Sequence, residues 1–231
     1  MASYEKPDFW ALKAQKEGYP ARSVYKLKEI DDKYHLFKPG TSRLVPGLPE
    51  PGIRILELGA APGSWSLYVL RLYAKTGKPA ALPGGRSGSA ENAILLAAAD
   101  LLPLSRRFDG GLFDRKDFFF IQGDFTESAV KGELTRRGPY TTIISDAAPA
   151  TTGIRTVDTL RSLALAEEVV LSYAEKSLAP GGNLALKVFQ GADTAALLKR
   201  LREQFNNVKS FKPVACRSDS FETYYIGLGK R

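Results

Sequence analysis

The chain has 231 residues, of which 44% are hydrophobic and 25% are charged, as in ordinary globular proteins. Its single cysteine excludes an intrachain disulfide, and one cysteine with one histidine excludes the usual structural zinc sites. The longest apolar stretch, near residues 93–102, is interrupted by Asp100 and is too short to span a bilayer, and the first ten residues lack a signal pattern. We therefore expect a reduced, cytoplasmic, monomeric protein without a membrane segment or a metal.

The net charge of +8 is confined to the two ends of the chain. Lys and Arg exceed Asp and Glu by three over residues 1–43 and by five over residues 196–231, whereas residues 44–195 are neutral. Two basic ends indicate a polyanionic partner, most commonly RNA or DNA. Charge alone is equally consistent with a role in solubility.

Hydrophobic spacing predicts helices alternating with strands along most of the chain. We expect a broken helical region over residues 7–38, five strands at 53–58, 93–99, 118–122, 141–145 and 184–189, and helices at 64–75, 157–178 and 193–205. Two closing strands are expected at 208–214 and 221–228, and a surface insertion at 76–92. This alternation predicts an α/β fold with a doubly wound, mostly parallel sheet, whose ligand site lies beyond the carboxyl ends of the strands.

The first predicted strand runs into a turn of small residues, ILELGAAPGSW at 55–65. Gly59 and Gly63 allow a ligand to approach the backbone closely where the next helix begins. The turn lacks the GxGxxG pattern, so a small nucleoside-like cofactor is favoured over a dinucleotide. Glu57 would repel a phosphate but suits a cationic group. The alternative is an ordinary tight turn between a strand and a helix.

Acidic residues follow the ends of three predicted strands. Asp100 and Asp124 follow the second and third strands, and Asp146 follows the fourth. Carboxylates at these positions suit ribose hydroxyls or an exocyclic amine. Each of them alone could equally be a turn or cap residue, so their repetition at successive strand ends is what favours a cofactor site.

Two charged residues lie inside predicted strands that are otherwise apolar. Lys187 interrupts LALKVF, and Glu222 lies in the last strand. Burying a lysine is costly unless it is paired, which favours a buried functional role for Lys187 over an exposed or edge position. The lone carboxylate of Glu222 is similarly out of place in its apolar strand, and the alternative for it is an edge-strand charge that blocks aggregation.

Seven motifs together resemble the FtsJ/RrmJ (RlmE-type) RNA 2′-O-methyltransferases, in order through nearly the whole chain. They are ARSVYKL (21–27), LELGAAPGSWS (56–66), DLLP (100–103), QGDF (122–125), SDAAP (145–149), LAPGGNLALKVFQG (178–191) and FETYYIGLGKR (221–231). The resemblance implies a Rossmann-like methyltransferase fold that binds S-adenosylmethionine, with a mostly parallel seven-stranded sheet and helices on both faces. It also implies methylation of a uridine ribose in the A loop of large-subunit ribosomal RNA. The alternatives are methylation of another RNA (transfer RNA or a cap), a non-catalytic RNA-binding ribosome-assembly factor, and a small-molecule methyltransferase.

The resemblance also implies the site residues, position by position. A Lys-Asp-Lys-Glu tetrad falls on Lys26, Asp146, Lys187 and Glu222. We expect Lys187 either to remove the proton of the hydroxyl or to stay protonated and orient it, while Asp146 orients Lys187 and Glu222 positions Lys26. The expected cofactor-binding residues are Glu57, Gly59, Ala60, Pro62, Gly63, Ser64, Trp65, Asp100, Leu101, Asp124, Phe125 and Asp146.

The sequence departs from the family pattern in three places. Ser64 replaces a usual third glycine, the segments 76–92 and 104–117 are longer, and fewer arginines precede Glu222. Residues 1–43 are expected to form a helical, RNA-facing extension, which makes one globular unit with the methyltransferase domain at 44–231. The predicted RNA-binding residues are Lys6, Lys13, Lys16, Arg22, Lys212 and Arg217.

Overall fold

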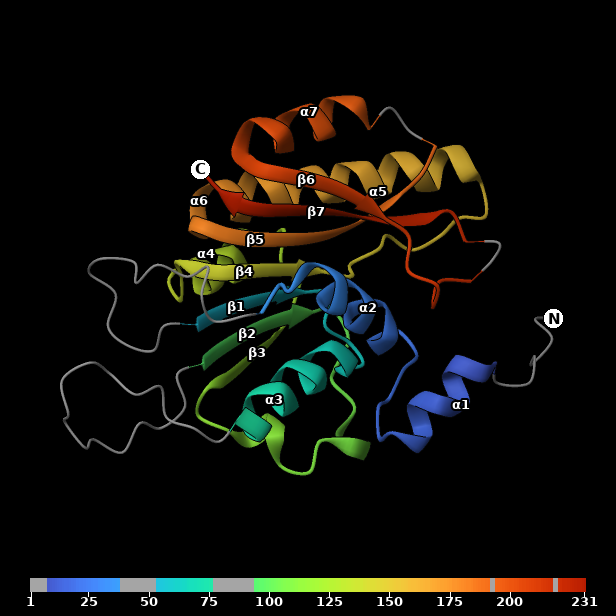
Figure 1. Ribbon diagram of the computed structural model, residues 1–231, viewed down its shortest axis with the longest axis vertical. Coiled ribbons are helices and arrows are strands. Elements are labelled where there is room, and N and C mark those ends of the chain that lie inside the picture. The colour runs from blue at the N-terminus through green and yellow to red at the C-terminus, as the bar shows by residue number, and fades with distance from the viewer. Residues whose placement is uncertain (1–7, 38–52, 77–93, 192–193, 218–219) are drawn as a thin grey trace.

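The computed structural model describes residues 8–37, 53–76, 94–191, 194–217 and 220–231. A seven-stranded sheet with the order β3-β2-β1-β4-β5-β7-β6 forms its centre (Figure 1). The strands are β1 (Ile53–Leu58), β2 (Ile94–Asp100), β3 (Phe118–Gln122), β4 (Tyr140–Ser145), β5 (Leu178–Phe189), β6 (Phe205–Phe211) and β7 (Glu222–Lys230). The strands from β3 to β5 pair in parallel, and β7 is antiparallel to both β5 and β6. The expected mostly parallel seven-stranded sheet is confirmed.

Helices cover both faces of the sheet. On one face lie α1 (Phe9–Lys16), α2 (Val24–Tyr34) and α3 (Ser64–Thr76). On the other lie α4 (Ser128–Thr135), α5 (Arg155–Val169) and α7 (Ala195–Gln204). A π-helical turn, η3 (Val170–Ala174), and the short α6 (Glu175–Ser177) connect α5 to β5, and two short 3-10 turns, η1 (Arg106–Phe108) and η2 (Leu112–Asp114), precede β3.

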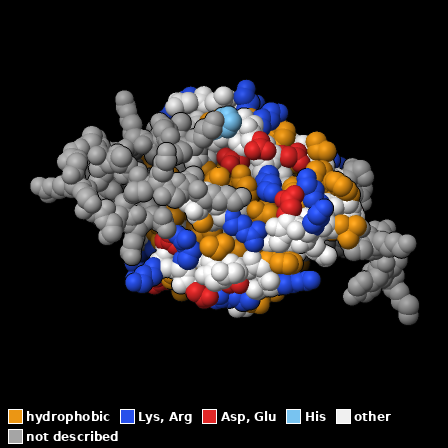
Figure 2. Space-filling model, turned by 60° about the horizontal axis from the view of Figure 1, so that its bottom comes forward, with side chains coloured by type: hydrophobic (Ala, Val, Ile, Leu, Met, Phe, Trp, Pro, Cys, Tyr) orange, Lys and Arg blue, Asp and Glu red, His pale blue; other side chains and the backbone are white. Residues whose placement is uncertain are grey.

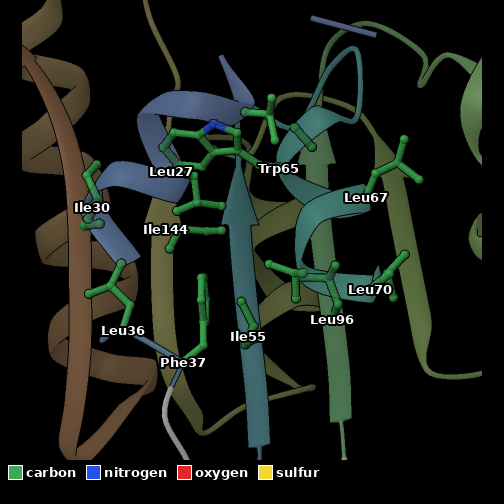
Figure 3. Packing of buried hydrophobic residues seen from close by; sticks show 14 of the residues in the cluster. Leu27, Ile30, Leu36, Phe37, Ile55, Trp65, Leu67, Leu70, Leu96 and Ile144 are labelled. Atoms are coloured by element: carbon green, nitrogen blue, oxygen red, sulfur yellow. The ribbon is translucent and has the colours of Figure 1, made fainter. Parts of the chain in front are cut away.

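Each face of the sheet has its own hydrophobic core. In β1 the side chain of Ile55 packs with the α2 and α3 side, whereas Leu56 and Leu58 pack with the α5 side. Figure 3 shows the first core, in which Leu27 of α2 and Leu67 of α3 lie over the strands. Because a sheet covered on both faces buries every position of its central strands, these strands read as continuous apolar runs in the sequence.

The N-terminal helices belong to the same packed unit as the sheet. Ala14 of α1 and Val24, Leu27 and Ile30 of α2 are buried in one cluster with residues of α3, β1 and β2. The predicted division at residue 43 lies outside the described residues, and the division into two regions stays a prediction.

Most predicted elements are confirmed, with three differences. The helical segment ends at Ser177, close to the predicted end ahead of Pro180-Gly181-Gly182, but the next strand begins at Leu178 and not at 184, so these three residues lie within β5. There they form a bulge, because Tyr140 pairs with Leu178 while Thr142 pairs with Asn183. Strand β6 begins earlier than the predicted 208, since the ring of Phe205 packs directly over Gly227 of β7.

The third difference is α4, which was not predicted. Its eight residues bury Leu134 and present little apolar face, so the sequence carries a weak helical signal there. The predicted surface insertion at 76–92 lies, apart from its first residue, outside the described residues. Within the parts of the chain that the structure describes, no helix is long and apolar enough to cross a membrane.

Candidate active site

The turn after β1 brings the backbone to the carboxyl edge of the sheet. Gly59 has φ +77°, and a Cβ atom there would lie 2.5 Å from the backbone of Ala147, which follows β4. Gly63 has φ +101°, and a Cβ atom there would lie 2.8 Å from the ring of Phe113. Both positions therefore require glycine, because of the left-handed backbone and because of the close neighbours. Phe113 belongs to the longer 104–117 segment, which thus packs against this turn.

A pocket of about 760 Å³ opens where β1, β2, β3 and β4 end. Its volume suits a ligand of nucleoside size or somewhat larger. Six of the residues expected to bind a cofactor line it, namely Gly59, Asp100, Leu101, Asp124, Phe125 and Asp146.

The carboxylates of Asp100 and Asp124 are held by the backbone at the pocket wall. Asp100 accepts hydrogen bonds from the N–H groups of Ala61 (2.8 Å) and Leu102 (2.9 Å). Asp124 accepts with Oδ1 from the backbone N–H (2.8 Å) and the hydroxyl (2.7 Å) of Thr126. A carboxylate oxygen has more than one lone pair, so each group can hold its loop and still accept hydrogen bonds from a ligand. The turn role and the ligand role proposed from the sequence are compatible here.

Ser64 and Trp65 lie behind the pocket and hold the segment that leads into α2. The Ser64 hydroxyl accepts from the N–H of Ala21 (2.8 Å) and donates to its carbonyl (3.1 Å). Trp65 donates from Nε1 to the carbonyl of Ser23 at 2.8 Å. The departure from glycine at Ser64 therefore supplies a hydroxyl that ties the first turn of α3 to the chain just before Lys26. Ala60 and Pro62 lie in the turn itself, and Ala60 donates its N–H to Ala99.

Glu57 is buried beneath the turn, with 1% of its surface exposed. Its Oε2 accepts from the Ser66 hydroxyl at 2.6 Å, while Oε1 has no hydrogen-bond partner among the described residues. Burial raises the pKa of Glu57 to about 8, and the nearby carboxylates of Asp146 and Asp100 add to this rise. An unpartnered buried carboxyl oxygen can accept a hydrogen bond from a ligand or from a bridging water. The expected pairing of Glu57 with a cationic group stays a prediction.

The four expected tetrad residues come together as two ion pairs at the pocket rim. Lys187 Nζ lies 3.1 Å from Asp146 Oδ1 and donates to the Asp146 carbonyl at 2.5 Å. Lys26 Nζ lies 2.7 Å from Glu222 Oε1. The exposed fractions of the four side chains are between 8% and 16%. Because Asp146 also lines the pocket, the ion pairs and the pocket meet at this residue.

The two ion pairs act on each other electrostatically. Burial by itself would raise the pKa of Asp146, but the ammonium groups of Lys187 and Lys26 lower it below its usual value. Burial by itself would lower the pKa of Lys26, but the carboxylates of Asp146 and Glu222 raise it. Because buried pairs gain little net stability after desolvation, two of them at a pocket rim indicate chemistry rather than structural support.

Sequence reasoning missed Tyr224, which joins the tetrad through Asp146. Lys187 of β5 pairs with Tyr224 of β7, and the Tyr224 hydroxyl donates to Asp146 Oδ1 at 2.6 Å. Burial raises the pKa of Tyr224 well above its usual value, so the hydroxyl stays a donor. In the sequence this tyrosine resembles any aromatic residue of an apolar strand, and no spacing signal distinguishes it.

The residues expected to bind RNA occupy different environments. Lys16 is exposed on α1, whereas Lys13 lies over the rings of Trp10 and Tyr25 and 4.0 Å from Glu17. Arg22 forms an ion pair with Asp8 and donates to the Ala215 carbonyl at 2.5 Å. Internal contacts thus occupy Arg22, and Lys6 lies outside the described residues.

The other two predicted RNA-binding residues lie in the β6–β7 loop, of which residues 212–217 and 220–221 are described. Lys212 donates to the Ser220 carbonyl at 2.6 Å, and Arg217 is exposed. Figure 1 shows this loop and α1 at the edge of the sheet where the parallel strands end. On the face shown in Figure 2, basic side chains are interspersed with acidic and hydrophobic ones rather than gathered in one patch. RNA binding by these residues stays a prediction.

The described residues contain no group of three or more His, Cys, Asp or Glu that could hold a metal ion.

The chain is similar to known methyltransferases over nearly its whole length. A family model described as FtsJ-like methyltransferase matches residues 19–230. The chain is 44% identical to ribosomal RNA large subunit methyltransferase E of Treponema denticola, over 97% of this chain and 96% of the relative. It is 40% identical to the protein of the same name from Oleidesulfovibrio alaskensis, over 96% of this chain and 91% of the relative.

A crystal structure described as that of a ribosomal RNA methyltransferase from Plasmodium falciparum has the same fold. Its TM-score is 0.65 at 23% identity, covering 92% of this chain and 98% of that one. The family model and the curated relatives each extend over nearly the whole chain, from the segment before Lys26 to the end of β7. The chain belongs to the FtsJ-like methyltransferase family.

Proposed function

We propose that this enzyme transfers the methyl group of S-adenosylmethionine to a ribose 2′-hydroxyl of large-subunit ribosomal RNA. The observation that carries the proposal is the pair of ion pairs, Lys26–Glu222 and Lys187–Asp146, at the rim of a nucleoside-sized pocket. The names of the curated relatives support the substrate class, and the family resemblance implies a uridine of the A loop.

S-adenosylmethionine is the methyl donor of this enzyme, and the residues of the pocket fit it. We assign the carboxylate of Asp100 to the ribose hydroxyls and that of Asp124 to the exocyclic amine of the adenine, because both line the pocket and keep acceptor capacity. Beneath the same turn, Glu57 keeps one carboxyl oxygen without a partner among the described residues, and this oxygen can accept a hydrogen bond from an amino group of the cofactor or from a bridging water. When bound, S-adenosylmethionine supplies a methyl group on a sulfonium, which is electrophilic without further activation.

The tetrad provides the groups that can align the ribose 2′-hydroxyl and remove its proton. A 2′-hydroxyl is a poor nucleophile, so the site must align it and take its proton. The side chain and the carbonyl of Asp146 both accept from Lys187 Nζ, which fixes the direction in which this amine faces the substrate. Glu222 fixes Lys26 beside it. We assign to Lys187 the removal of the proton from the hydroxyl. The alternative is that Lys187 stays protonated and orients the hydroxyl, and the variants Lys187→Met and Lys187→Arg distinguish the two roles.

A methyl-transfer assay tests the function directly. With tritium-labelled S-adenosylmethionine, we expect label in large-subunit ribosomal RNA, recovered as an alkali-resistant dinucleotide because a 2′-O-methyl group blocks hydrolysis of the adjoining phosphodiester. Transfer RNA, capped RNA and a catechol serve as competing acceptors. Label on one of these acceptors and none on ribosomal RNA would contradict the substrate. Tight RNA binding without any transfer would identify an assembly factor instead.

Asp100→Ala is expected to weaken S-adenosylmethionine binding by about 10- to 100-fold, the cost of losing hydrogen bonds to a charged acceptor. Calorimetry of the free enzyme measures this affinity. Asp114→Ala is the matched control, because Asp114 is an exposed acid of the neighbouring η2 turn that pairs with Arg106. Equal affinities in the wild type and in Asp100→Ala would refute the assignment to the cofactor ribose.

Neutralising Lys13 and Lys16 together, by Lys→Gln, is expected to weaken binding of RNA of any sequence. The slope of log affinity against log salt should become shallower by about one for each phosphate that the variant no longer neutralises. S-adenosylmethionine affinity should not change. The control replaces Lys176 and Lys199, two exposed lysines of α6 and α7, by glutamine. If both double variants weaken RNA binding equally, the loss of affinity comes from the lower net charge of the protein and not from an RNA-binding surface that includes α1.

A further inference from the structure

We propose that Glu29 is a positioning residue that fastens the β6–β7 loop to α2 and so holds Glu222 in place against Lys26. The inference rests on the proposed methyl transfer to RNA, since its readout is the rate of that reaction. It gives a role to a residue outside the tetrad and outside the cofactor pocket.

The carboxylate of Glu29 binds two successive backbone N–H groups of the loop. Oε2 accepts from Val214 at 2.6 Å, and Oε1 accepts from Ala215 at 2.9 Å. Ala215 is fully buried, so its backbone polar groups need partners within the protein. Arg22 satisfies the Ala215 carbonyl at 2.5 Å. Residues of the α2 region therefore hold both backbone polar groups of Ala215.

The same helix reaches the loop at a second place through Lys26. Lys26 and Glu29 are three residues apart in α2, so their side chains lie on neighbouring positions of one helix side. Glu29 binds the loop at Val214 and Ala215, and Lys26 binds Glu222, where β7 begins. The helix thus binds the loop at Val214 and Ala215 and binds the first residue of β7 at Glu222.

The position of Glu222 matters to the rest of the tetrad. Two residues further along β7, Tyr224 donates to Asp146, which holds Lys187. Cys216, the residue after Ala215, interacts with the Glu222 carboxylate, so releasing Val214 and Ala215 would also disturb the position of Glu222 against Lys26. Because a displacement of about 1 Å at a reacting group can lower a rate by about 100-fold, a small movement is sufficient.

Glu29→Gln is the direct test, because glutamine keeps the shape but can accept with one oxygen only. We expect kcat for methyl transfer to ribosomal RNA to fall by about 10- to 100-fold, with unchanged calorimetric affinity for S-adenosylmethionine. Glu17→Gln is the matched control, since Glu17 also contacts α2, through an ion pair with Lys28 at 2.7 Å. It should keep kcat within about 2-fold of the wild type. An unchanged kcat in Glu29→Gln overturns the proposal.

A double-mutant cycle separates positioning from a general loss of structure. If Glu29 acts through Glu222, then Glu29→Gln should lower kcat by less than about 2-fold when Glu222 is already glutamine, because coupled residues give non-additive losses. Full additivity of the two losses would mean that Glu29 supports the fold independently of the tetrad, and it would overturn the proposal.

Hydrogen exchange of the wild-type enzyme keeps the proposal testable even where Glu29→Gln folds poorly. Val214 is 78% exposed, so its amide should exchange at the rate of a free loop unless Glu29 binds it. We expect slow exchange of the Val214 and Ala215 amides. Fast exchange would show that Glu29 does not hold them and would overturn the proposal. Failure of the wild type to methylate ribosomal RNA would instead overturn the proposed function and would leave the exchange result standing.

Discussion

Replacing Lys187 by methionine is expected to lower the rate of methyl transfer to ribosomal RNA by about 1000-fold, in the middle of the range for general acid–base catalysis. Methionine has a similar length and fits the buried position in β5, but it has no proton acceptor and no hydrogen bond for Asp146. Single-turnover transfer of a tritiated methyl group measures the effect. Asp146 keeps the Tyr224 hydroxyl as a partner, so the variant should fold and bind S-adenosylmethionine.

Lys187→Arg distinguishes the two roles left open for Lys187. Arginine stays charged at every relevant pH, so it can orient a hydroxyl but cannot accept its proton. A loss as large as that of Lys187→Met supports the base, whereas activity near that of the wild type identifies an orienting group. Lys209→Met, at an exposed position of β6 in the same sheet, is the control and should be fully active. Less than about a 10-fold loss in Lys187→Met itself would remove Lys187 from the chemistry.

The second large effect concerns stability and comes from Glu57. Burial raises its pKa from 4.5 to about 8. Between these two pH values the folded protein keeps a proton that the unfolded chain has released, so the free energy of unfolding falls as the pH rises. The contribution of protonated Glu57 is fully present below about pH 4.5 and is lost by about pH 8. Its full size is roughly 5 kcal/mol, from about 1.4 kcal/mol for each pKa unit.

Glu57→Gln should remove this pH dependence, because glutamine stays neutral and its amide oxygen still accepts from Ser66. Urea unfolding at pH 5.5 and pH 8.5, without S-adenosylmethionine, gives the free energies of both proteins. We expect similar values at the lower pH and a variant that is more stable by several kcal/mol at the higher one. If the free energy of unfolding changes by the same amount in both proteins between the two pH values, the Glu57 carboxyl does not titrate in this range. Glu203→Gln, an exposed acid of α7, controls for the change in net charge.

The order of helices and strands and the chemical character of the cofactor edge could be predicted from the sequence, because both depend on local information. A strand buried on both faces must be apolar, and a backbone with a positive φ at Gly59 or Gly63 requires glycine. Asp100, Asp124 and Asp146 were found because the carboxyl ends of parallel strands meet at one edge of a sheet. The family resemblance identified Lys26, which composition and periodicity do not distinguish from the other lysines of the chain.

Element boundaries and side-chain partners required the folded structure. The Pro180-Gly181-Gly182 segment indicates the end of a helix, which does end at Ser177, but only the pairing with β4 shows that the segment itself belongs to β5. Ser64 reads locally as a mild departure, but its hydroxyl ties α3 to the chain before Lys26. In both cases the deciding contact comes from a segment distant in the sequence.

The same holds for the site. From the sequence alone it follows that a lysine and a glutamate lie in apolar strands. This favours a functional role for Lys187 and leaves an edge-strand charge open for Glu222. Only the packing of the strands and helices pairs Lys187 with Asp146, and Glu222 with Lys26 from the opposite end of the chain. The same packing brings in Tyr224 and Glu29, which hold this arrangement together. The physical reason is that burial and hydrogen bonding set the partner of a charged group, and both arise when the sheet brings β4, β5 and β7 beside α2.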